Sequence, residues 1–160
     1  MANAEDFAEN EWAAVCAAAH GAGLAMMLVG SSGLVGSMKE MLVAGRTAAA
    51  GAEHASELIR AMCTPEAMGA MRVRVAAVWE VGTDPRVALQ ARVIAWLHEA
   101  VAALRVKAPE DLETYRDWVL GFADSVANAG SEGSFLGIGG EKVSAEEARF
   151  LAAVRGALEG

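Results

Sequence analysis

The 160-residue sequence is poor in aromatic residues, proline and cysteine, and each shortage narrows the range of folds. Aromatic residues make up 6 % of the chain, and isoleucine, threonine and tyrosine are sparse, so the β-strand signal is weak. Cys16 and Cys63 lie far apart in apolar, helix-like stretches, where a free cysteine commonly behaves as a small buried hydrophobe. Because nothing else indicates an oxidising compartment, we expect a cytoplasmic protein and disfavour a disulfide.

Basic residues are scarce as well, because 13 lysines and arginines stand against 21 acidic residues and leave a net charge of −8. A protein that binds duplex nucleic acid needs clustered Lys and Arg to replace condensed counterions, and the sequence has no basic run. The same shortage disfavours docking to anionic membrane surfaces. We therefore expect no nucleic-acid partner.

The stretch from Trp12 to Met38 has no charged residue apart from His20, and this length could span a bilayer. The residues before it are acidic, whereas a signal peptide begins with basic residues. Its second half is rich in Gly and Ser, and no Lys/Arg cluster flanks it. We expect no membrane span here, but a central helix that is buried on most of its circumference.

Alanine dominates what is present, and apolar residues reach 54 %. Apolar positions recur every three or four residues, which predicts an all-α fold: one compact domain, 1–160, with a bundle of about six to eight helices. The helices are expected at residues 6–29, 37–50, 52–62, 65–82, 85–104, 109–126 and 144–158. A turn is expected at 30–36, and a break near His20 to Gly23 is an alternative to one continuous first helix.

Five glycines occur within eleven residues between the last two predicted helices, together with the apolar residues Phe135, Leu136 and Ile138. Such a loop has a defined shape that tucks apolar groups onto the core, or it binds a ligand such as phosphate through its backbone N–H groups. It matches neither the P-loop pattern nor the dinucleotide fingerprint. The candidate ligand-binding residues are Glu132, Gly133, Gly137, Gly139 and Gly140.

A faint internal repeat relates this loop to residues 30–36, since Gly30-Ser-Ser-Gly33 is similar to Gly130-Ser-Glu-Gly133. Each segment follows a predicted helix that contains a tryptophan, Trp12 or Trp118. An ancient duplication would give two related helix-loop-helix halves, 5–80 and 84–160. Chance similarity of two Gly/Ser loops is the alternative.

The chain resembles a family of uncharacterised bacterial helical proteins of about this length. The matching residues are Trp12, Gly33-Leu34, Lys39-Glu40, Ala108-Pro109-Glu110, Trp118, Val143-Ser144, Glu147 and above all Glu132-Gly133-Ser-Phe-Leu-Gly137-Ile-Gly139-Gly140. More distantly it resembles TerB-like tellurite-resistance domains, which implies an all-α fold and a role in metal or stress response. The loop of that family is typically Ala-Asp-Gly followed by several acids. Here Ser131-Glu132-Gly133 is followed by Phe and Leu, which argues against metal binding by that route.

Other chemical sites are weakly indicated. Cys16 and His20 share a helical face and could supply two metal ligands, but a metal usually needs three or four, so buried packing is favoured. The sequence lacks the Glu-x-x-His pairs of a di-iron bundle, the spacing of an EF-hand and a nucleophile elbow. The methionines in the first half either fill the core or form an adaptable partner surface.

These patterns favour a non-catalytic protein without a cofactor, acting in protein association or in a stress-related accessory role. The apolar content also predicts a homodimer. The alternative is a small-ligand or divalent-metal-binding protein that uses the loop at 130–140 and its acidic neighbours, with the metal ligands left open.

Overall fold

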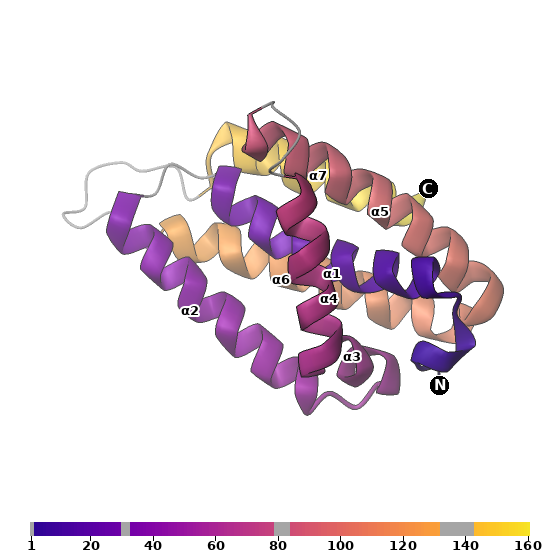
Figure 1. Ribbon diagram of the computed structural model, residues 1–160. Coiled ribbons are helices and arrows are strands. Elements are labelled where there is room, and N and C mark those ends of the chain that lie inside the picture. Colours follow the sequence, from indigo (N-terminus) through magenta and orange to yellow (C-terminus); the bar gives the residue numbers. More distant parts are fainter. Residues whose placement is uncertain (1, 30–32, 79–83, 132–142) are drawn as a thin grey trace.

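The computed structural model describes residues 2–29, 33–78, 84–131 and 143–160 (Figure 1). Within these ranges the chain is helical and has no strand. The α-helices are α1 (Glu9–Val29), α2 (Gly33–Ala52), α3 (Glu57–Met62), α4 (Pro65–Val78), α5 (Pro85–Lys107), α6 (Leu112–Ser131) and α7 (Ala145–Glu159). Two 3₁₀ turns, Ala4–Asp6 and Pro109–Asp111, precede α1 and α6. The predicted all-α bundle of six to eight helices is confirmed.

Helix α1 forms the centre of the bundle. It packs most extensively against α5 and also against α6, α4, α7 and α2. In Figure 1, α5 and α7 lie on one side of it, α2 lies on the other, and α4 crosses over it. Every residue from Ala14 to Gly23 is buried. The first part of the uncharged run, up to Val29, therefore belongs to a helix that other helices surround, whereas its last part, from Gly33, belongs to α2.

By length and hydropathy alone, both α1 and α5 could cross a membrane. The core helix of a soluble protein passes the same test, and the most apolar window of α1 is 67 % buried inside the bundle. The expectation of no membrane span stays a prediction.

Several helix starts follow their sequence signals. The Ser144 hydroxyl accepts a hydrogen bond from the Glu147 N–H (3.2 Å), and the Glu147 carboxylate accepts one from the Ser144 N–H (2.7 Å). This reciprocal pair is the predicted capping box. Thr64 caps α4 by accepting from the Ala67 N–H at 3.2 Å. Asp84 likewise accepts from the Arg86 N–H at 3.0 Å, before Pro85 opens α5.

Two predicted boundaries are wrong, and one alternative is decided. Helix α1 is continuous through residues 20–23, since its glycines there are helical and buried against other helices. Helix α2 starts at Gly33, so residues 33–36 are helix and not turn. The helix expected at 52–62 starts only at Glu57, because the Ser56 hydroxyl caps it by accepting from the Ile59 N–H. Glycine and serine in the sequence thus indicated turns at positions where packing and capping determine the helix ends.

Gly21 and Gly23 lie where α1 contacts its neighbours closely. A Cβ at Gly23 would lie 2.5–2.7 Å from ring atoms of Phe122 on α6, and a Cβ at Gly21 would lie 3.0 Å from Val93 on α5. By contrast, nothing lies within 4 Å of a Cβ at Gly121. The first pair lets α1 approach two neighbours at once, whereas Gly121 serves no such contact.

We predict opposite effects for two glycine-to-alanine substitutions. Gly23→Ala overpacks the α1–α6 contact and lowers the free energy of unfolding by about 1–3 kcal/mol. Gly121→Ala gains helix propensity without a clash and raises the free energy of unfolding by about 0.5–1 kcal/mol. Urea denaturation of the two variants measures both changes. Equal stabilisation by both would show that α1 and α6 are farther apart than described.

Candidate functional site

The predicted ligand loop cannot be placed. Glu132, Gly133, Gly137, Gly139 and Gly140 all lie outside the described residues. Helix α6 continues through Gly130 to Ser131, so the loop begins later than its first glycine suggested. Among the described residues, no group of three His, Cys, Asp or Glu side chains could hold a metal ion.

An apolar groove of about 520 Å³ lies between α2 and α4. Its walls come from these two helices, and its floor comes from α1 and Phe122 of α6. Most of the lining residues are apolar, and four of them are methionines. The lining residues are His20, Leu24, Met27, Met41, Ala44, Gly45, Ala48, Met68, Met71, Arg72, Val75, Ala76 and Phe122.

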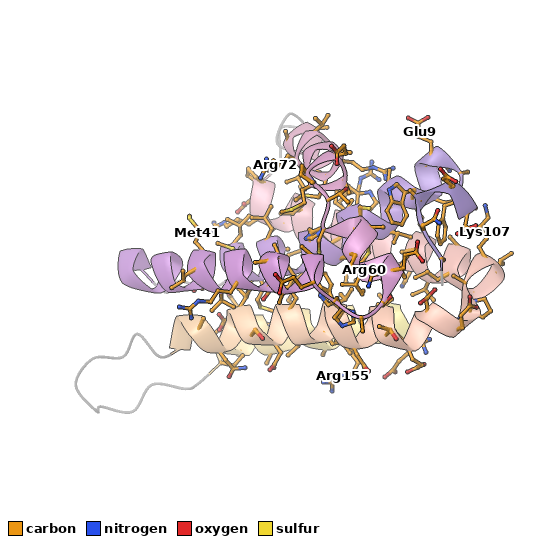
Figure 2. All side chains as sticks on the ribbon, turned by 90° about the horizontal axis from the view of Figure 1, so that it is seen from below. Glu9, Met41, Arg60, Arg72, Lys107 and Arg155 are labelled. Carbon is orange, nitrogen blue, oxygen red and sulfur yellow. The ribbon has the colours of Figure 1, made fainter. Side chains whose placement is uncertain are left out.

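A second apolar hollow of about 480 Å³ continues this groove along α2 and is lined by Met41, Leu42, Gly45, Arg46 and Ala49. The two hollows share Met41 and Gly45. Met41 is 65 % exposed and Leu42 is 55 % exposed. In Figure 2, Met41 points away from α2 on the side where α4 carries Arg72. We call this continuous surface the methionine groove.

The groove forms because α2 and α4 each pack against other helices more than against one another. Helix α2 lies mainly along α6, with further contacts to α3 and α1, while α4 lies on α1 and α5. Met68, Met71 and Val75 follow one another at spacings of three and four, so they share the face of α4 that borders the groove. Because α2 and α4 stay apart, the apolar side chains on their facing sides are only partly covered.

The methionines divide into two sets by their place in the fold. Met26 and Met62 are fully buried and belong to the core. Met27, Met41, Met68 and Met71 line the groove. Sequence reasoning did not single out this second set as a site. The adjacent apolar residues Met41 and Leu42, close to Gly45, are the signal that could have done so, because they extend beyond one core-facing stripe.

The Cys16–His20 pair is packing and not part of a metal centre in the described structure. The His20 Nε2 lies 2.9 Å from the carbonyl oxygen of Met62, and its ring meets Trp118 edge-on at 5.4 Å between centroids. Cys16 and Cys63 are both free and buried. Burial raises the pKa of Cys16 to about 12 and that of Cys63 to about 11. At neutral pH both thiols are therefore largely protonated, and the protonated form is a poor nucleophile and a poor metal ligand.

Burial also lowers the pKa of His20, although its hydrogen bond to Met62 opposes this effect. The folded protein therefore holds the imidazole neutral, whereas the unfolded chain takes up a proton as pH falls through the ordinary value of 6.5. The stability contributed by neutral His20 is complete above that value. It is lost progressively at lower pH.

We predict that wild-type protein loses more stability than His20→Gln between about pH 7.5 and about pH 5.5. Urea unfolding at both pH values measures the two losses, and their difference cancels the effect of the substitution on packing. His54 and His98 are present in both proteins and serve as an internal control. An equal loss in both proteins would contradict a buried neutral His20.

Glu40 is the most unusual polar residue in the described structure. It is 2 % exposed, and neither carboxylate oxygen has a hydrogen-bond partner among the described residues. A buried polar group without a partner costs free energy that its exposed counterpart does not. On the described contacts, burial of the Glu40 carboxylate therefore opposes the packing of α2 in the bundle.

We predict that Glu40→Leu raises the free energy of unfolding by about 1–3 kcal/mol, because leucine has similar length and loses no hydration on burial. Glu40→Gln, which keeps the shape and removes the charge, should give a smaller increase. Thermal and urea denaturation at neutral pH measure both. Destabilisation by both variants would mean that the Glu40 carboxylate has a partner.

Comparisons of the chain with protein-family models, with curated proteins and with solved structures found no match. The resemblances to bacterial helical proteins and to TerB-like domains stay predictions.

Proposed function

We propose that this protein is a non-catalytic helical domain that associates with other proteins through the methionine groove. The observation that carries the proposal is an open apolar groove in the described surface, with two large apolar side chains exposed beside it. Contiguous exposed apolar surface of this kind marks interaction sites in soluble proteins. Methionine side chains suit it because they adapt to the shape of a partner.

The shape of the groove favours an amphipathic helix as the occupant. The apolar strip on α2 runs from Met41 to Ala49, a length of about 12 Å at the helical rise. A partner helix would lay apolar residues spaced by three and four along it, as in other helix-in-groove complexes. We place this association in the cytoplasm, and a stress-related accessory role fits the TerB-like resemblance.

A small apolar ligand is the second candidate, because a volume of about 520 Å³ lies within the range of ligand pockets. Such pockets usually bury most of the ligand surface. Met41 stands largely in solvent, so a helix that covers it gains more than a small molecule in the main hollow. Binding of a small ligand or divalent metal at residues 130–140 is a separate proposal, since most of that segment lies outside the described residues.

The test uses a labelled synthetic amphipathic helix with a leucine face, and fluorescence anisotropy measures its binding. We predict that Gly45→Gln weakens binding about tenfold, because a long amide then occupies the junction of the two hollows and loses hydration beneath the peptide. No atom lies within 4 Å of a Cβ at Gly45, so the substitution fits the folded protein and improves helix propensity.

Gly121→Gln is the matched control, since Gly121 is equally open but belongs to α6 and lines neither hollow. It should leave peptide binding unchanged. Equal weakening by both variants, or no effect of Gly45→Gln on a peptide that binds, would place the binding surface elsewhere.

A further inference from the structure

We infer that the occupant of the methionine groove is an acidic amphipathic helix from a different protein, whose carboxylates flank its apolar face and pair with Arg46 and Arg72. This inference rests on the proposed function and adds the charge of the partner. It follows from the charges that border the groove, from the lack of partners for them in the described part of the chain, and from the symmetry that self-association would impose.

The border of the groove is basic although the protein is acidic. Arg72 of α4 lines the main hollow, and Arg46 of α2 lines the second. Among the described residues, no Asp or Glu lines either hollow. The whole chain, in contrast, has a net charge of −8. A surface of opposite sign to the rest of the molecule selects partners by charge and speeds their approach.

Both guanidinium groups are available for a partner. Arg46 and Arg72 are exposed, and neither makes a hydrogen bond or ion pair with the residues that the structure describes. Several other arginines are engaged. Arg60 donates to the carbonyl oxygens of His54 and Ala55, and Arg116 pairs with Glu113. Because a guanidinium presents a planar fork of donors, carboxylates are its natural partners.

A second copy of this chain is a poor occupant of the groove. In a two-fold dimer the same patch meets itself, so the arginines of one copy would face those of the other. None of the described residues that line the hollows is acidic, so none offsets this repulsion. The predicted homodimer, if it forms, would therefore use another surface. A helix with glutamates on both edges meets Arg46 on one wall and Arg72 on the other.

The experiment compares three labelled synthetic helices that share one leucine face and differ only in flanking residues, which are Glu, Gln or Lys. We expect affinity to fall in that order, with about a tenfold difference between the first and last. Raising the salt concentration should reduce the difference, because it screens exposed charges. In the Arg46→Glu/Arg72→Glu variant the order should reverse.

Arg92→Glu/Arg155→Glu is the matched control, since it changes net charge equally. Neither residue lines the methionine groove, and Figure 2 shows Arg155 on the opposite side of the molecule from Met41. This variant should keep the original order with a smaller spread. Circular dichroism and thermal unfolding would establish that both double variants are folded.

Each of the other possible outcomes contradicts a specific part of the inference. Equal binding of all three helices overturns the acidic partner but leaves the proposed function intact. If none of the three helices binds, both the acidic partner and the proposed function are contradicted. Displacement of the acidic helix by dodecanoate, together with equal binding of a scrambled peptide, identifies a single-chain amphiphile as the occupant. Light scattering that shows a dimer, dissociated by Gly45→Gln, identifies a second copy.

Discussion

The structure depends on how closely other helices can approach α1. From Ala14 to Gly23 this helix presents mostly alanine and glycine, and all ten positions are buried. Small side chains let α5, α6 and α4 come near the α1 backbone, and the larger residues that fill the spaces come from those neighbours, such as Trp96 and Phe122. Tyr115 adds a directional contact, because its hydroxyl donates to the Val15 carbonyl oxygen at 3.0 Å. The bulky side chains around this part of α1 thus come from the neighbouring helices.

This arrangement explains why the bundle covers its core unevenly. A central helix of small residues is surrounded by neighbours that each need a wide contact, and α2 and α4 both reach the same side of it without closing over one another. Most of the residues that line the space between them are apolar, and the longest of these side chains are methionines. Methionine can fill such an irregular space without fixed geometry, which keeps the groove compatible with water and with a partner.

Sequence periodicity predicted the helices well where polar signals mark their ends, as at Thr64-Pro65, Asp84-Pro85 and Ser144. It failed near glycine, because Gly21, Gly23 and Gly33 resemble turn residues until the neighbouring helices are known. The groove was harder still. Met26 and Met27 are adjacent in the sequence, yet one is core and the other borders the groove. The positions of α2 and α4 decide which of the two methionines is core and which borders the groove. The pattern of a single sequence does not predict those positions.

Helix α2 joins the two unusual features of this molecule. Its described side chains bury Glu40 without a described partner and pack Gly51 against Cys63 and Trp118. Elsewhere the same helix exposes Met41 and Leu42. A buried carboxylate without a partner costs free energy, so the packing of α2 gains less than an apolar residue at this position would give. A partner that covers Met41 and Leu42 would bury apolar area that α2 leaves in water in the free protein. The unpaired carboxylate and the exposed apolar side chains then have the same consequence, because a partner helix would complete the burial of this wall of the groove.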